Sequence, residues 1–178
     1  MPRAPRPPEP RTDAAAAWPG MLGGRDVDEE VTPVCDYCDC RTRPLLAHLG
    51  ADHERILTGV HGLRTATDSG DADRRMVLAG ELVDVLEEHG RLEEAALYPE
   101  LALAGVPTDA MEAEHEDVDA VLRRAAGAPD VDPVELATAL RRLEAHIHRE
   151  EYDLFPAAHQ VLDDAAWDRI HLELERSS

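Results

Sequence analysis

The most constraining feature of this sequence is a motif that occurs twice. The motif, H-x-x-x-E-E-x-x-L-aromatic-P, spans His89–Pro99 and returns at His146–Pro156. Each copy follows a second matched segment with one histidine, Ala51–Glu54 before the first and Ala113–Glu116 before the second. The repeating unit is therefore a helix with a lone histidine, then a helix with a histidine and a glutamate four residues apart. Two copies bring together four imidazoles and at least two carboxylates, which is typical of a two-metal site inside a helix bundle.

The spacing within the motif places histidine and glutamate on one face of a helix. A step of four residues turns an α-helix by about 400°, so His89 lies over Glu93, and His146 lies over Glu150. Apolar residues share these stripes, namely Leu82, Leu86 and Leu97 in the first copy and Leu143 and Leu154 in the second. The histidine–glutamate pairs are therefore predicted to point into the core.

Histidine and glutamate side chains in a helix-bundle core need partners that offset the cost of burying them. Burying carboxylates and imidazoles costs several kcal/mol for each uncompensated charge. A bound divalent metal removes that cost, and mixed imidazole and carboxylate ligands suit iron or manganese, and also zinc. The pattern therefore predicts a metal site.

The predicted fold is all-α, an up-down-up-down four-helix bundle with a disordered N-terminal tail and a short C-terminal helix. Hydrophobic residues make up 43% of the chain and aromatic residues only 3%, so Leu, Val and Ala must build the core. Periodicity and capping residues predict helices over 44–67, 73–103 and 108–126, a fourth that begins at 133, and a last short helix that ends near 175. Val77 is expected on the buried stripe of the second helix, which Pro99 should kink or close early.

Three segments are expected along the 178 residues. Residues 1–34 are rich in proline and are predicted to be disordered, because they cannot offset their ordering entropy by burial. Residues 35–43 form a cysteine-rich leader, and residues 44–175 form the bundle.

The leader contains Cys35, Cys38 and Cys40 within a short stretch. Three thiolates could bind zinc with one outside ligand such as His48, or serve as a redox motif. A passive interpretation, in which the thiols pack on the end of the bundle, stays open.

The net charge of −20 disfavours nucleic acids and anionic lipid surfaces as partners, because both would be repelled. No apolar run approaches the roughly 18–20 residues of a membrane span, and the N-terminus lacks the apolar core of a signal peptide. We therefore expect a cytoplasmic protein whose cysteines remain thiols. The sequence leaves its oligomeric state open.

From about residue 44 to residue 162 the pattern resembles the hemerythrin-like, or HHE cation-binding, family. The resemblance implies a four-helix bundle with a non-haem di-iron centre. It also implies a ligand set, in which the first and third helices give one histidine each and the second and fourth give a histidine and a carboxylate. By motif these ligands are His53, His89, Glu93, His115, His146 and Glu150.

The sequence departs from the oxygen-carrying hemerythrins, which have two histidines four residues apart on the third helix. Here the positions four before and four after His115 hold Met111 and Asp119. The oxygen carriers place an aspartate five residues after the last histidine, where this chain has Glu151, so Glu150 and Glu151 compete for that role. The missing imidazole opens a coordination position for water, Asp119 or a tyrosine. Reversible oxygen carriage is therefore disfavoured.

The resulting hypothesis is a di-iron protein, with manganese or zinc as other candidate metals, that binds or reacts with O2, H2O2 or NO. Glu93 and Glu150 are the candidates to bridge the two ions. The alternative is a non-enzymatic sensor of iron, oxygen or redox state that acts through a partner, so enzymatic activity stays open. The remaining histidines are expected to be ordinary, with His61 the best placed among them to lie behind a ligand.

Overall fold

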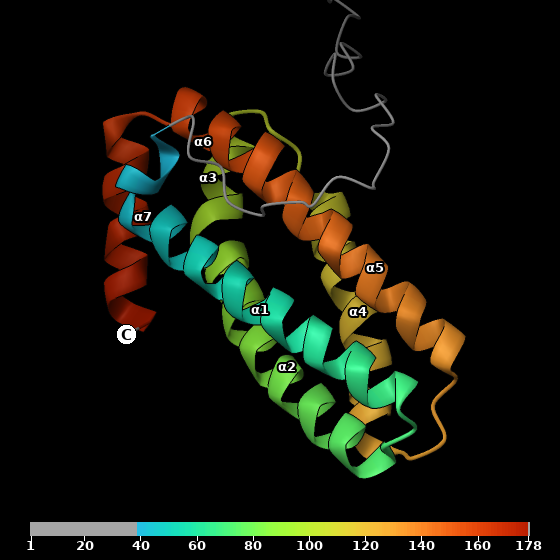
Figure 1. The fold of residues 1–178 in the computed structure, drawn as a ribbon. Coiled ribbons are helices and arrows are strands. Elements are labelled where there is room, and N and C mark those ends of the chain that lie inside the picture. Colours follow the sequence, from blue (N-terminus) through green and yellow to red (C-terminus); the bar gives the residue numbers. More distant parts are fainter. Residues whose placement is uncertain (1–38, 178) are drawn as a thin grey trace, which may run out of the picture. The chain divides into compact units, whose positions relative to one another are not determined.

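The computed structural model describes residues 39–177 (Figure 1). Its helical segments are η1 (Cys40–Thr42), α1 (Pro44–Asp68), α2 (Ala72–Leu92), the π-helical turn η2 (Glu93–Leu97), α3 (Tyr98–Leu103), α4 (Asp109–Gly127), α5 (Pro133–Arg149), the π-helical turn η3 (Glu150–Leu154), α6 (Phe155–Val161) and α7 (Asp164–Ser177). This part of the chain contains no β-strand, and none of its helices has the length and apolar character of a membrane span. The predicted disorder of residues 1–34 falls outside it.

Four long helices form the bundle. Helices α1 and α4 each pack against both α2 and α5, so every long helix has two neighbours. The connection between α1 and α2 and the connection between α4 and α5 lie at the same end of the bundle (Figure 1). This is the predicted up-down-up-down arrangement. The C-terminal helix α7 packs against η2 and α1.

The helix boundaries follow local signals in the sequence. Asp71, Asp132 and Asp163 each accept a hydrogen bond from a backbone N–H in the first turn of the helix that follows. Asp132 directly precedes residue 133, where the fourth helix is predicted to begin. Thr108 stands at the predicted start of α4, but its hydroxyl makes no capping bond. Gly70, with a φ of 71°, adopts the left-handed conformation of the predicted break between α1 and α2.

A layer of buried polar residues divides the core into two apolar clusters. On α1, His53 lies between Leu49 of one cluster and Ile56 of the other. On α4 the order repeats, because Met111 belongs to the first cluster and Val118 to the second. The histidines predicted to face the core therefore do so in the middle of the bundle.

One predicted core position is wrong. Val77 is 60% exposed, whereas Ala79, Leu82 and Val83 on the same helix are buried. Five residues separate Val77 from Leu82, which rotates its side chain about 140° away from the buried stripe.

Both copies of the repeated motif interrupt their helices in the same way. The backbone N–H of Tyr98 donates to the carbonyl of Glu93, and that of Phe155 donates to the carbonyl of Glu150. These are the i→i+5 bonds of a π-helical turn. The proline after each aromatic residue has no N–H to donate, and its ring would clash with the carbonyl four residues back in a regular α-helix. The helix predicted over 73–103 is therefore broken into α2, η2 and α3.

Candidate metal centre

Four imidazoles meet in the polar layer, one from each long helix. The Nε2 atoms of His53 and His89 lie 3.1 Å apart, and those of His115 and His146 lie 2.8 Å apart. All four predicted histidines are thus brought together as two pairs. We refer to His53 and His89 as the inner pair and to His115 and His146 as the outer pair.

Two fully buried carboxylates join the two pairs. Oε2 of Glu93 lies 3.5 Å from Nε2 of His89 and 3.5 Å from Nε2 of His115. The oxygens of Glu150 lie 3.2 and 2.9 Å from the Nε2 atoms of the remaining two histidines. Each carboxylate therefore reaches one histidine of each pair.

The six side chains form two overlapping groups with the spacing of metal sites. One group is His53, His89, Glu93 and Glu150, and the other is Glu93, His115, His146 and Glu150. Within each group the candidate ligand atoms all lie within 4.8 Å of one another. Both carboxylates belong to both groups, which is the arrangement that two bridged ions require.

The electrostatics of the layer depend on burial. Burial raises the pKa of Glu93 well above its usual range, and the negative charge of Glu150 raises it further. Burial would also raise the pKa of Glu150, but the charges and hydrogen bonds of His146 and His53 outweigh it and hold that pKa well below its usual range. Burial lowers the pKa of His89 to about 3, and the charge of His53 acts in the same direction. Without a cation, the layer can be neutralised only by protons shared among these groups.

Unpaired atoms show that a cation suits this site. Oε1 of Glu93 and Nδ1 of His89 are buried and have no hydrogen-bond partner among the described residues. Buried polar atoms of this kind are costly. A metal ion between the facing imidazoles would give the unpaired carboxylate oxygen a cationic partner.

A further carboxylate stands behind each imidazole, on the Nδ1 side. The separations are 2.7 Å from His53 Nδ1 to Glu151 Oε1, 2.8 Å from His146 Nδ1 to Glu114 Oε2, 3.2 Å from His115 Nδ1 to Glu94 Oε1 and 4.0 Å from His89 Nδ1 to Asp52 Oδ2. A carboxylate at Nδ1 fixes the ring so that Nε2 faces inward, as is usual for metal-binding histidines. Asp52 is too distant for a hydrogen bond, which leaves Nδ1 of His89 unpaired.

The structure separates the two competing glutamates. Glu150 lies in the cluster, whereas Glu151 lies behind His53 and outside both groups. Asp119, a candidate for the open coordination position, also lies outside both groups, and its Oδ2 accepts a hydrogen bond from Nε of Arg123 at 2.5 Å.

The other candidates stand apart from the cluster. Cys40 is buried and disulfide-bonded, so the expected free thiol is absent at this position and it offers no thiolate to a metal. Cys35 and Cys38 lie outside the described residues. His61 is exposed and lies outside both groups, as expected of an ordinary histidine.

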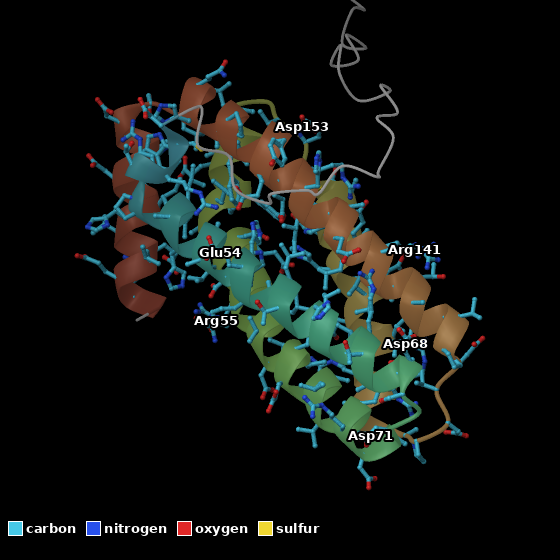
Figure 2. All side chains as sticks on the ribbon, in the orientation of Figure 1. Glu54, Arg55, Asp68, Asp71, Arg141 and Asp153 are labelled. Atoms are coloured by element: carbon cyan, nitrogen blue, oxygen red, sulfur yellow. The ribbon has the colours of Figure 1, made fainter. Side chains whose placement is uncertain are left out.

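The exposed side chains around the motifs mark the outside of the bundle. Glu54 and Arg55 follow His53 on α1, and Asp153 belongs to η3; all three lie at the surface (Figure 2). The histidine–glutamate stripe and these charged residues therefore occupy different faces of the same elements.

Tyr98 is the site residue that sequence reasoning did not identify. Its hydroxyl lies 3.1 Å from Oε2 of Glu93 and 3.0 Å from Oε1 of Glu150, within donating distance of both carboxylates. Burial and the two negative charges raise the pKa of Tyr98 far above its usual value, so the hydroxyl keeps its proton. The π-helical turn makes this contact, because it lets the residue five positions after Glu93 share its face. The aromatic residue common to both motifs was the available signal.

The two pairs differ in their access to solvent. The inner pair and His146 are buried, whereas the side chain of His115 is 16% exposed and that of Glu94 behind it is 48% exposed. The polar layer therefore comes nearest to solvent at the outer pair.

Comparison with known proteins agrees with this geometry. The hemerythrin HHE cation binding domain matches residues 45–158, which include all six side chains of the cluster. The uncharacterized proteins Mb2666c of Mycobacterium bovis and Rv2633c of Mycobacterium tuberculosis are each 33% identical to the chain over 123 residues, which cover 66% of this chain and 75% of each relative. No solved structure matches the chain significantly. The family match and the buried histidine–glutamate cluster together show that this chain belongs to the hemerythrin HHE cation-binding family.

Proposed function

We propose that this protein is a non-haem di-iron protein whose centre binds or reacts with a small ligand, either O2, H2O2 or NO. The observation that carries the proposal is the sharing of Glu93 and Glu150 between two groups of candidate ligands. Each ion would be held by two imidazoles and by an oxygen from each shared carboxylate. His53 and His89 would hold one ion, and His115 and His146 the other.

The donor set favours iron without requiring it. Nitrogen and oxygen donors of this kind also bind manganese and zinc. That iron is the metal bound in the cell is therefore part of the proposal. When bound, a pair of irons would supply the redox steps and the small-ligand binding that protein side chains lack. The protein contributes the binding geometry, the exclusion of water and the control of protons.

The open position is proposed to lie at the outer pair. Met111 is buried in the core one helical turn before His115, and a thioether is a poor ligand for iron in a nitrogen and oxygen site. His115 is also the half-buried histidine of the four. A small ligand would therefore approach past His115 and Glu94.

Tyr98 is proposed to hold a proton beside this position. Its hydroxyl faces both shared carboxylates and is buried among apolar residues. A protonated phenol can donate a hydrogen bond to a carboxylate whose charge changes as the centre changes state.

The test is the metal content and the absorption spectrum of the purified protein. We expect two irons per chain and near-ultraviolet bands that change when azide or peroxide is added. His89→Ala should lose iron, whereas His61→Ala, which changes an exposed histidine, should not. The proposal fails if the iron content of His89→Ala equals that of the wild type.

The same samples separate an enzyme from a sensor. Catalytic consumption of peroxide or NO by the loaded protein indicates an enzyme. A spectral change that is complete after one equivalent of ligand indicates the sensing alternative, in which a partner protein reads the state of the centre.

A further inference from the structure

A chain of hydrogen bonds links the inner pair to the segment that precedes the bundle. Nη2 of Arg41, in η1, lies 3.1 and 3.3 Å from the two carboxylate oxygens of Glu151 and donates to them. Oε1 of Glu151 in turn lies 2.7 Å from Nδ1 of His53. The side chain of Glu151 is only 1% exposed, so its contacts within the protein determine its orientation.

Gly50 provides the space that Arg41 occupies. A Cβ atom at this position of α1 would lie 2.6 Å from Cζ and 2.6 Å from Nη2 of Arg41, far closer than such atoms approach. The guanidinium therefore lies directly against the backbone of α1, in a place that any other residue would fill. Gly50 lies three residues before His53 on the same helix. Arg41 therefore enters the bundle beside His53, and it contacts Glu151, the carboxylate behind that histidine.

The physical role of this contact is orientation. A buried carboxylate that lacks a cationic partner is costly, and it turns toward whatever donor is available. The guanidinium offsets the charge of Glu151 and contacts both of its oxygens, which leaves Oε1 directed at Nδ1 of His53. That hydrogen bond aims Nε2 of His53 into the polar layer.

We propose that Arg41, seated over Gly50, is a positioning residue for the ion of the inner pair and acts through Glu151 on His53. This inference rests on the proposed two-ion centre. The outer pair has a corresponding chain, because Arg149 contacts Glu114 and Glu114 contacts Nδ1 of His146. Each arginine should therefore control one ion and leave the other unaffected.

The experiment titrates metal-free protein with Co(II), whose visible spectrum reports each ligand environment, and determines the two dissociation constants separately. Removing a partner behind a metal-binding histidine typically weakens metal binding by about 10–100-fold. Arg41→Gln should weaken the binding of the ion at the inner pair by about tenfold and change the spectrum of that ion. Arg149→Gln should instead weaken the binding of the ion at the outer pair.

Gly50→Ala gives an independent arm of the test, because the added methyl group displaces the guanidinium without altering any polar atom. We expect it to reproduce the effect of Arg41→Gln and to add nothing to it in the double variant. Gly62→Ala is the matched control on α1, since its Cβ would meet Leu78 at an ordinary 3.7 Å. Both alanines favour the helix, so a loss confined to Gly50→Ala cannot come from a weakened α1.

The outcomes separate the two proposals. If the wild type binds fewer than two ions, the proposed centre is wrong. If the wild type binds two ions and Arg41→Gln binds both with unchanged constants and spectra, the positioning role of Arg41 is wrong and the centre stands. Equal weakening of both ions by Arg41→Gln also overturns it, because a general structural effect does not select one ion.

Discussion

The inner and outer pairs of histidines use the same donors in different surroundings. His53 and His89 lie fully inside the bundle, and the carboxylate behind His53 is buried beneath Arg41, whose side chain is only 25% exposed. His115 and the carboxylate behind it, Glu94, reach the surface. The internal repeat thus supplies two chemically equal ligand sets, and the packing around them makes the sets unequal. In the proposed two-ion centre, the inner ion would stabilise the bundle and the outer ion would meet the incoming ligand.

The largest effect is expected from a residue that both pairs share. Glu150→Ala should abolish the binding of both ions, with a loss of more than about 100-fold for each, because the carboxylate belongs to both ligand groups. Metal content after dialysis measures this loss. Asp153→Ala, at an exposed position of the same π-helical turn, is the control and should retain both ions. Retention of one ion by Glu150→Ala would show that the two sites are not bridged by this residue.

Single histidine variants test the inequality of the pairs directly. In the metal-free protein, His53→Ala should lower the free energy of unfolding by about 3–5 kcal/mol, because it takes a partner from the buried carboxylates of Glu150 and Glu151 and leaves a cavity. It also removes the stacking of His53 on Phe155, whose ring centroids lie 5.5 Å apart. His115→Ala should cost only about 1 kcal/mol, since water can replace its contacts.

Urea denaturation of the two metal-free variants measures this difference. Equal losses would mean that the exposure of the outer pair has no energetic consequence, and the assignment of different roles to the two ions would then lose its basis.

A substitution at Tyr98 should affect both pairs alike. Tyr98→Phe removes the donor that serves Glu93 and Glu150 and places phenylalanine where the second copy of the motif has Phe155. We expect a loss of about 2 kcal/mol in the free energy of unfolding of the metal-free protein, since the hydrogen bond reaches charged groups. We also expect altered spectra at both ions after Co(II) loading.

Leu103→Ala, at a 79% exposed position of the same helix α3, is the comparison and should change stability by less than about 0.5 kcal/mol. A spectral change at only one ion of Tyr98→Phe would place the hydroxyl in one half of the site and contradict its shared role.

Tyr98 also marks where sequence reasoning ends. The spacing of His89 and Glu93 predicted which face of the helix is buried, because regular α-helical geometry relates the two positions. The contact of Tyr98 with Glu93 depends on a π-helical turn, which shifts the phase of every later residue on that helix. A proline after an aromatic residue indicated a break in the helix without indicating its type.

The competition between Glu150 and Glu151 had a different cause. Glu150 and Glu151 differ by one position, and both fit the resemblance to the hemerythrin-like family. Only the packing of α1 and η1 distinguishes them, since Glu151 is directed toward His53 and Arg41. That distinction depends on long-range contacts, which the pattern of a single helix does not contain.

The smallest effect is expected at Glu94, the exposed carboxylate behind His115. Glu94→Gln should weaken binding of the outer ion by about twofold and leave binding of the inner ion unchanged. The reason is that a half-exposed carboxylate competes with water for Nδ1 of His115. Co(II) titration at low and high salt measures the effect, which should shrink as salt screens the charge. Glu151→Gln is the buried counterpart and should weaken the inner ion by about 10–100-fold at either salt concentration. A larger effect from Glu94→Gln than from Glu151→Gln would reverse the order of the two pairs, since it would show that solvent exposure does not weaken the carboxylate behind the outer pair.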